Sequence, residues 1–183
     1  MKRLTLPTAS KGFGLIELLC VVTIIALLAV WAVSDYTSIR QRAQLAQTAS
    51  QLVDAIDYSR QYARHLSTDS ILCAGEPIDQ CQSTQWNQGF TLFQADYSKT
   101  PALLQPVRFF QAEATGLNIA FAPDPGKGII INKDGFVSDS ELSAVVCHQS
   151  QDFHFEINVH RAQTKAVEHE VSTTGLEGCK NAL

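Results

Sequence analysis

The chain has 183 residues and a formal net charge of −4 at pH 7. This length is sufficient for one domain with a hydrophobic core, and the lack of a long run of lysines and arginines argues against a nucleic-acid footprint. No fixed repeat and no low-complexity tract is present, which argues against a solenoid or a disordered tail. The apolar residues are unevenly distributed, because the segment from Phe13 to Val33 carries only the charge of Glu17.

The segment from Phe13 to Val33 is long enough to cross a membrane as a helix. At about 1.5 Å per residue it would reach roughly 31 Å, the thickness of a bilayer hydrocarbon core. Lys2, Arg3 and Lys11 precede it. We therefore expect residues 1–12 to form a basic leader on the cytoplasmic side, and the residues after the segment to face outward.

Two other interpretations of this segment are open. A secretory signal could be cut after Val30-Trp31-Ala32, although the apolar stretch is longer than usual for such a signal. A plain signal anchor would hold a periplasmic binding domain at the membrane. A lipoprotein signal is excluded, because Leu18-Leu19 precedes Cys20 where a small residue is needed.

Glu17 separates these interpretations, because a carboxylate within a membrane helix costs a few kcal/mol unless it has a partner or a function. The surrounding sequence is Lys11-Gly12-Phe13-Gly14-Leu15-Ile16-Glu17. It resembles the class III signal of type IV prepilins and pseudopilins, in which a basic leader ends in glycine, an aromatic residue begins the mature chain and glutamate is its fifth residue. The chain departs from this pattern at Gly14, where threonine or serine is common.

The resemblance implies that a prepilin peptidase cuts between Gly12 and Phe13 and methylates the new Phe13 amine. It also implies that Glu17 pairs with the Phe13 amine of a neighbouring subunit, an ammonium group that would offset the desolvation of a membrane-buried carboxylate. The implied partners are other pilins or pseudopilins through the N-terminal helix, the peptidase, the inner-membrane assembly platform, and membrane lipid before assembly.

The residues after Val33 show a one-sided helical pattern. Polar residues such as Arg40, Asp54 and Arg60 occupy one face and predict an amphipathic helix. The apolar residues of the other face are Ile39, Ala43, Ala46, Ala49, Val53, Ile56 and Ala63. We therefore divide the chain into a cleaved leader (1–12), a transmembrane or assembly helix (13–33), an amphipathic helix (34–66) and a periplasmic β domain (67–183).

The last of these regions predicts an antiparallel β-sheet or sandwich behind the helix, and thus an α+β fold. Asp134-Gly135 is a hairpin signal, and the stretch from Phe153 to His160 alternates apolar and polar residues. The strand candidates are Ser70–Ala74, Gly89–Ala95, Val107–Gln111, Leu117–Ala122, Gly128–Asn132, Phe136–Ser138, Ser143–Cys147 and Asp152–Arg161.

Four of these stretches resemble successive strands of the GspH/FimT group of minor pseudopilins and minor pilins. They are Trp86–Phe93, Val107–Phe109, Ile129–Ile131 with Gly135, and Val145–Cys147. The resemblance implies a structural subunit and not an enzyme, most directly an H-like pseudopilus component of a type II secretion system that serves protein secretion. The alternative is a FimT/FimU-like type IV pilus minor pilin, with DNA uptake as a specialisation.

The five cysteines differ in location. Cys20 lies in the apolar segment, where we expect it to be a buried apolar filler. The other four would lie in an oxidising compartment, and the sequence alone leaves three pairings open. We favour Cys73–Cys81 and Cys147–Cys179. A zinc site is the alternative, but the spacings fit no usual ligand pattern, so we expect no metal and no cofactor.

No catalytic constellation stands out. His154 and His160 are expected on the exposed face of one strand, roughly 20 Å apart, too far for one metal ion. In FimT-type pilins that bind DNA, an arginine-rich stretch near the C-terminal strand carries the contacts, and here only Arg161 and Lys165 correspond to it. From Leu66 onward, 7 Lys and Arg face 14 Asp and Glu, so DNA binding is a minority hypothesis.

Overall fold

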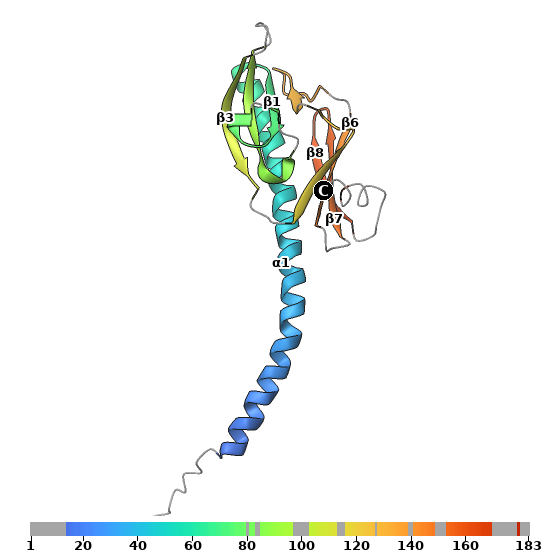
Figure 1. Ribbon diagram of the computed structural model, residues 1–183. Helices are drawn as coiled ribbons and strands as arrows, with labels where there is room; N and C mark the ends of the chain where they lie inside the picture. Colours follow the sequence, from blue (N-terminus) through green and yellow to red (C-terminus); the bar gives the residue numbers. More distant parts are fainter. Residues whose placement is uncertain are drawn as a thin grey trace, which may run out of the picture. The chain divides into compact units, whose positions relative to one another are not determined.

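The computed structural model describes residues 14–79, 81–82, 85–96, 103–112, 116–126, 128–138, 141–148, 153–169 and 179, with the backbone alone at 30–35, 79, 103, 141 and 169. The chain divides into two compact units, residues 1–39 and 40–183. Helix α1 (Leu15–Leu66) contributes to both units (Figure 1). Gly12 and Phe13, the expected processing site, lie outside the described residues.

The first unit contains the N-terminal part of α1. The helix begins where the backbone amides of Glu17 and Leu18 donate to the carbonyl oxygen of Gly14, at 3.0 and 3.2 Å. Every side chain from Leu15 to Ala29 is exposed, and Leu15 itself is 83% exposed. Among the helical residues with described side chains, no helix is both long enough and apolar enough to cross a membrane.

In the second unit, one face of α1 is buried. The buried residues recur three or four positions apart, which places them on one side of a helix. They are Leu45, Thr48, Ala49, Leu52, Ala55, Ile56, Ser59, Arg60 and Ala63. The predicted stripe is wrong at its start, because Ile39 and Ala43 are exposed, and Arg60 belongs to the buried face and not to the polar one.

Eight strands form two antiparallel sheets, seen in Figure 1. The first sheet has the order β3-β2-β1-β5, and its strands are β1 (Ser70–Ala74), β2 (Gly89–Asp96), β3 (Leu103–Gln111) and β5 (Ile129–Ile131). The second has the order β4-β6-β7-β8, and its strands are β4 (Leu117–Ala122), β6 (Glu141–His148), β7 (His154–His160) and β8 (Thr164–His169). Two short 3-10 helices, η1 (Pro77–Asp79) and η2 (Trp86–Gln88), lie between β1 and β2.

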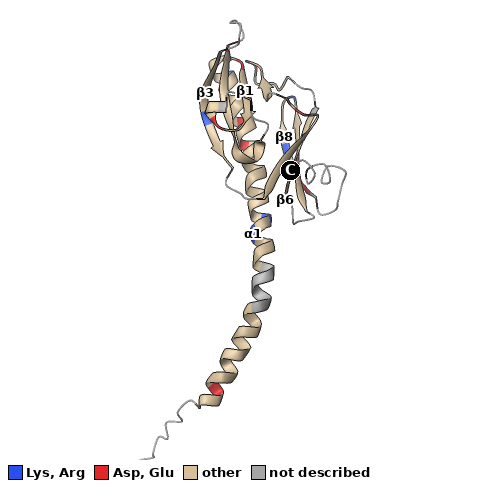
Figure 2. Cartoon of the chain, in the orientation of Figure 1, with Lys and Arg blue, Asp and Glu red and all other residues tan. Residues whose placement is uncertain are grey.

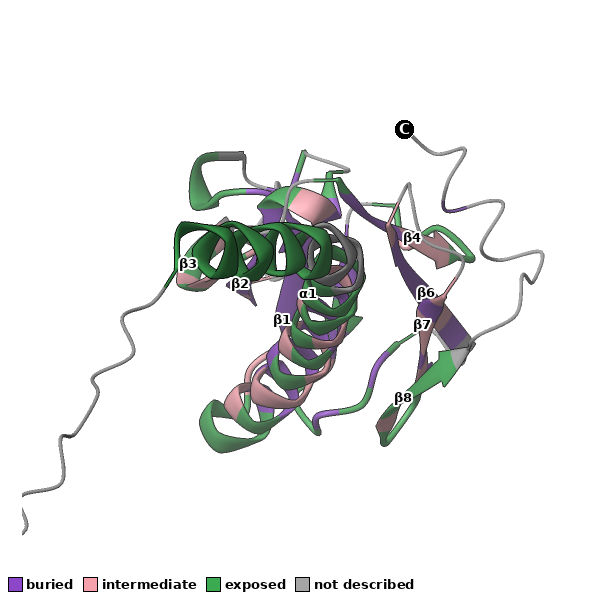
Figure 3. Cartoon of the chain, turned by 90° about the horizontal axis from the view of Figure 1, so that it is seen from below, coloured by how far each residue is buried: buried purple, intermediate pink, exposed green. Residues whose placement is uncertain are grey.

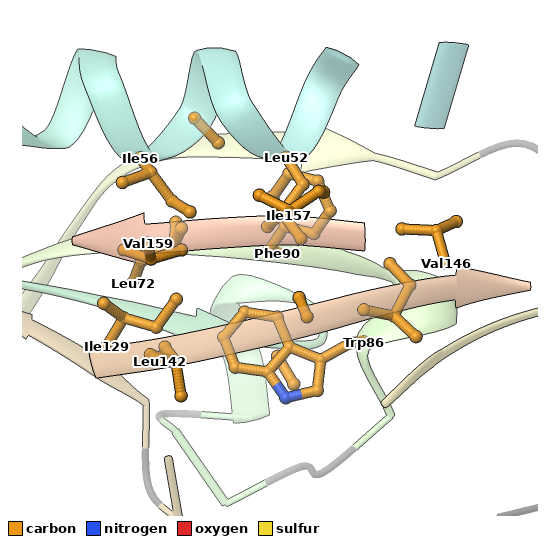
Figure 4. Packing of buried hydrophobic residues seen from close by; sticks show 14 of the residues in the cluster. Leu52, Ile56, Leu72, Trp86, Phe90, Ile129, Leu142, Val146, Ile157 and Val159 are labelled. Carbon is orange, nitrogen blue, oxygen red and sulfur yellow. The ribbon is translucent and has the colours of Figure 1, made fainter. Parts of the chain in front are cut away.

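A single hydrophobic core joins α1 to both sheets. Figure 3 shows the strands of the first sheet and those of the second sheet as separate layers of the second unit. Leu52 and Ile56 of α1 lie close to Phe90 of β2 and to Ile157 and Val159 of β7 (Figure 4). Burial of each such side chain contributes about 1.5–3 kcal/mol, so these contacts hold α1 against both sheets.

The predicted α+β fold, with a long N-terminal helix and antiparallel sheets, is confirmed. One predicted strand, Phe136–Ser138, is reduced to the single bridge between Ile131 and Val137. The reason is local, because the side-chain oxygen of Asn132 accepts from the amide of Phe136, and the amide of Val137 donates to the carbonyl of Arg161 on another segment. Two backbone hydrogen bonds still join the segment to the end of β5, from the amide of Asn132 to the carbonyl oxygen of Phe136 and from the amide of Ser138 to that of Ile130, so the pairing is limited to this one bridge.

The prediction that His154 is exposed is wrong, because its side chain is fully buried. His154 pairs with Cys147 in the ladder between β6 and β7, so both side chains point to the same face of the second sheet. Cys147 and Cys179 form a small cluster on this face with Val145, separate from the main core. Cys179 therefore lies on a face of the second sheet that strand alternation alone predicts to be open to water.

Candidate assembly site

Glu17 lies in the first turn of α1, with its side chain exposed among apolar neighbours. Figure 2 shows this acidic position on a helix that is otherwise uncharged up to the stretch drawn in grey. A carboxylate in a first helical turn is favoured by the helix dipole, so the fold itself accommodates the charge. The exposed carboxylate remains available to a cationic group from outside the chain.

Gly14 occupies the position where the resemblance leads us to expect threonine or serine. A Cβ atom added to Gly14 would lie 4.0 Å from the Cγ2 atom of Ile16. The space at the start of the helix therefore accepts a small side chain, and the departure from the common pattern leaves the position of Glu17 unchanged.

The surface around Glu17 is apolar, and its polar groups are satisfied locally. Leu15 and Ile16 are 83% and 77% exposed. The hydroxyl of Thr23 donates to the carbonyl oxygen of Cys20, at 2.8 Å. Cys20, which we expected to be buried, is exposed and has a free thiol. The apolar side chains of this part of α1 are exposed and belong to no hydrophobic core within the described residues.

The remaining four cysteines form two disulfides in the second unit. Cys73 is bonded to Cys81, with Cα atoms 5.0 Å apart, and Cys147 to Cys179, with Cα atoms 6.3 Å apart. The side-chain amide of Asn118 donates to the carbonyl oxygen of Cys179, at 2.6 Å. The second disulfide and this hydrogen bond together fix residue 179 against β4 and β6.

Arg161 follows β7 and Lys165 lies on β8, and both side chains are exposed. The guanidinium of Arg161 lies 5.5 Å from the ring centroid of Phe136, and Lys165 is exposed on β8. Glu168 on the same strand forms an ion pair with Arg42 of α1, at 2.5 Å. Two cations offer weak attraction for a phosphate backbone.

Arg60 is a residue that the sequence reasoning missed. Its Nη2 atom donates to the carbonyl oxygen of His160 at 2.7 Å, which joins α1 to the end of β7. The Nε and Nη1 atoms are buried without a hydrogen-bond partner among the described residues. Burial lowers the pKa of Arg60, while Asp57 acts to raise it and Arg64 to lower it. A long cation at the flank of a helical stripe gives no sequence signal of its burial.

The described residues contain no group of three or more His, Cys, Asp or Glu that could hold a metal ion. A partly open pocket of about 340 Å³ is lined by Ala122, Pro123, Leu142, Ser143, Asn158, Val159 and His160. The hydroxyl of Ser143 donates to the carbonyl oxygen of Ala122, at 3.1 Å. This serine is therefore not arranged as a nucleophile activated by His160.

Two comparisons with known proteins found a match, one for the N-terminal segment and one for the fold. Residues 7–33 match a family model described as the prokaryotic N-terminal methylation motif. The fold is similar to the crystal structure of the type IV minor pilin FimU of Pseudomonas aeruginosa strain PAO1, with a TM-score of 0.56 and 14% identity over 70% of this chain and 92% of that chain. No curated protein matches the sequence. At this identity, the structural likeness establishes the fold.

Proposed function

We propose that this chain, a type IV minor pilin- or pseudopilin-like protein by its N-terminal motif and its fold, is a non-enzymatic structural subunit of a type IV filament-type machine. The observation that carries the proposal is Glu17, an exposed carboxylate in the first turn of an apolar helix, at the fifth position after Gly12. Such a group requires a partner once the helix leaves water.

The proposal assigns a role to each part of the chain. Residues 1–12 are the leader, residues 13–33 anchor the precursor as a single pass in the bacterial inner membrane, and residues 34–66 continue the helix into the pilin domain. Residues 67–183 complete that domain in the periplasm. The exposed apolar side chains from Leu15 to Ala29 support the anchor, and two disulfides support an oxidising location for the domain.

Glu17 pairs in this proposal with the Phe13 amine of a neighbouring subunit after cleavage. Both groups would otherwise be desolvated charges in an apolar filament core, so the pair forms only when two helices align in one register. The same chemistry selects the neighbour, because a helix displaced along its axis leaves both charges without a partner. Other pilins or pseudopilins, the prepilin peptidase, the assembly platform and lipid are the partners that this role requires.

Replacement of Glu17 tests the proposal. The Glu17→Ala variant should insert into the membrane and fold, but should be depleted from the sheared filament fraction by about tenfold, the effect of losing about 1.4 kcal/mol of pairing. Asp54→Asn is the matched control, because Asp54 is an exposed carboxylate on the same helix within the second unit. Normal incorporation of the Glu17→Ala subunit would overturn the pairing.

The machine that uses the subunit has two candidates. We propose an H-like component of the type II secretion pseudopilus as the first, from the strand pattern of the β domain. The second is a type IV pilus minor pilin, and the likeness to FimU, which is a likeness of fold, is compatible with both candidates. Deletion of the gene distinguishes them: loss of protein secretion with intact pili supports the first, and loss of pili with intact secretion supports the second.

DNA uptake is the specialised form of the second candidate, and Arg161 and Lys165 are its candidate contacts. Two cations are few for phosphate neutralisation, and the acidic balance from Leu66 onward also argues for weak contact only. We expect no shift of duplex DNA by the purified protein at physiological salt. A shift that disappears in the Arg161→Gln variant would establish the DNA-binding role instead.

A further inference from the structure

Strand β8 is the last strand of the second sheet, and β7 is its neighbour on one side. Its side chains from Lys165 to Glu168 are exposed, and Figure 3 shows most of the strand in the colour of exposed residues. The strand contains no proline and pairs with β7 in one continuous register. An edge of this kind presents unpaired backbone N–H and C=O groups to a further strand.

Each of the other three sheet edges has a feature that disfavours a further strand. On β3, Pro106 has no N–H to donate. Residues 136–138 already bond to β5. On β4, the side-chain oxygen of Asn118 accepts from the amide of Ile119, at 2.9 Å. Among the described residues, β8 has no covering segment, and its one protective feature is the charge of Lys165.

The backbone groups at the open edge follow from the register. The amide of His160 donates to the carbonyl oxygen of Gln163, at 2.8 Å, where β7 turns into β8. Because hydrogen bonds alternate along an antiparallel pair, every second residue after Gln163 bonds to β7, and the residues between them face the open side. These outward residues are Thr164, Ala166 and Glu168. Their backbone N–H and C=O groups have no partner within the described part of the chain.

We propose that the open edge of β8 binds an extended segment of a partner protein, which adds to the second sheet as a further strand. Hydrogen bonds to the backbone groups of the outward residues supply the affinity, and side chains beside them supply the preference for one sequence. The added strand also covers part of Val167, an apolar side chain that is 46% exposed.

The charges next to the edge favour an acidic residue in the added segment. Glu168 lies on the face toward α1, where Arg42 neutralises it in an ion pair. Lys165 lies on the opposite face, exposed and without an ion pair among the described residues, and Val167 follows it on that face. Glu156 shares the face but belongs to β7, on the side away from the edge. We therefore expect a carboxylate opposite Lys165 and an apolar side chain opposite Val167.

A second copy of this chain is a poor occupant of the edge. Two β8 strands that pair antiparallel are related by a twofold axis perpendicular to the sheet, which reverses every direction within the sheet. The later part of α1 runs alongside β7, the strand of Ile157 and Val159 (Figure 4). The two helices would therefore point in opposite directions, and subunits anchored in one membrane cannot pair in this way. This step alone rests on the proposed membrane role, and dimerisation is a separate outcome of the test.

Fluorescence anisotropy on the full mature protein in detergent tests the proposal. The probe is a labelled seven-residue peptide in which threonine alternates with valine, with one valine replaced by glutamate. Two further versions carry N-methyl groups on the amides of the threonine positions or of the other positions. A strand bonded to β8 uses only one of these sets of amides. We expect one N-methylated version to lose at least about tenfold in affinity, or about 1.4 kcal/mol, and the other to bind as the parent peptide does.

Two substitutions of Ala166 provide matched variants. Ala166→Pro removes one N–H from the open side and leaves the hydrogen bonds to β7 in place. Ala166→Thr retains the N–H and favours an extended strand. We expect the proline variant to lose at least about tenfold in affinity for the parent peptide, and the threonine variant to bind as the unaltered protein does. Thermal unfolding of both variants separates lost binding from lost folding.

Reversal of one charge tests the side-chain preference. The unaltered protein should bind the glutamate peptide about threefold more tightly than a version with lysine in its place, because opposite charges on neighbouring strands attract. The Lys165→Glu variant should show the reverse preference. The same order of affinities in both proteins would contradict the placement of the acidic residue opposite Lys165.

Amide hydrogen exchange gives a readout that needs no variant. The N–H groups of the outward residues should exchange rapidly in the free protein and slowly with saturating peptide, whereas those of Lys165 and Val167 should exchange slowly in both states. Equal binding of the two N-methylated peptides, unchanged binding by Ala166→Pro, or unchanged exchange of the outward amides would overturn the proposal. A dimer in detergent that the peptide dissociates would also overturn it, because the edge would then belong to a second copy. Incorporation of each variant into filaments is measured separately, so failure of the proposed filament role and failure of strand addition are distinguishable.

Discussion

The side chain of Arg60 is 3% exposed, although it lies at the flank of the buried stripe, where a polar residue is expected to reach water. Its hydrogen bond to the carbonyl of His160 joins α1 to β7, and its aliphatic part adds packing at the same place. Sequence pattern could not show this, because an arginine that reaches solvent and one that reaches a strand have the same spacing along a helix.

Replacement of Arg60 by alanine should therefore destabilise the domain. We expect the Arg60→Ala variant to lose about 2 kcal/mol of unfolding free energy, since a hydrogen bond from a charged donor and the packing of the side chain are lost together. Arg40→Ala, at an exposed position on the same helix, should change the value by less than about 0.5 kcal/mol. Urea unfolding of both variants gives the comparison, and equal values would show that the buried contact contributes nothing.

Gly89 begins β2 with φ of 123°, in a region that favours glycine. A Cβ atom there would lie 2.7 Å from the carbonyl oxygen of Phe110 and 2.8 Å from the ring of Phe109. We expect Gly89→Ala to cost about 2–3 kcal/mol, because the edge strand β3 would have to move. Gly126→Ala is the control, since Gly126 has φ of 60° with no atom within 4 Å of an added Cβ, and should cost about 1 kcal/mol. Thermal unfolding that ranks the two variants in the opposite order would contradict this account of the β2–β3 pairing.

At the scale of the elements, the two disulfides close loops of different length. The bonded cysteines are 8 residues apart in Cys73–Cys81 and 32 residues apart in Cys147–Cys179. By loop entropy, removal of the first bond should cost about 2.5 kcal/mol and removal of the second about 4 kcal/mol. Paired serine variants, Cys73→Ser with Cys81→Ser and Cys147→Ser with Cys179→Ser, provide the measurement in urea. Peptide mapping without reduction checks the pairing itself, and any other pairing would contradict the structure.

The strands whose bounds the sequence predicted correctly are short apolar runs with turn residues at their ends. Ser70–Ala74 and Leu117–Ala122 have the predicted bounds, because apolar runs ended by turn residues mark both. The strand β8 was not predicted, because Lys165, Ala166 and Val167 are all exposed, and a strand exposed on both faces has no alternation to detect. It is recognised only from its pairing with β7, a contact between residues that periodicity does not report.

Among the functional residues too, those defined by spacing along the chain could be predicted, and those defined by contacts between distant residues could not. Glu17 could be identified from spacing alone, since its relation to Gly12 and Phe13 is fixed along the chain. The burial of His154, which pairs with Cys147, and the close approach of Arg64 to Gly135 could not be identified, because only the folded chain brings these residues together. A motif of neighbouring residues can thus be identified from the sequence, whereas a contact between residues far apart in the chain requires the structure.

At the scale of the whole molecule, the chain combines an apolar N-terminal helix with an acidic domain of two antiparallel sheets. The helix has exposed apolar side chains from Leu15 to Ala29, whereas the domain has a core of its own that includes the later part of α1. In the proposed subunit role, assembly depends on the apolar helix and on the charge pair at Glu17. The domain folds around its own core and contributes no group to that pair.

The mature N-terminus tests the central claim most directly. The protein, purified from the membranes of cells that contain a prepilin peptidase, is analysed by intact mass and by sequencing of its N-terminal peptide. The account predicts a chain that begins with N-methylated Phe13 and lacks residues 1–12, and a Gly12→Val variant that retains its leader. A chain that begins with Met1, or one cut after Ala32, would contradict the account and support a signal-anchored or secreted periplasmic domain.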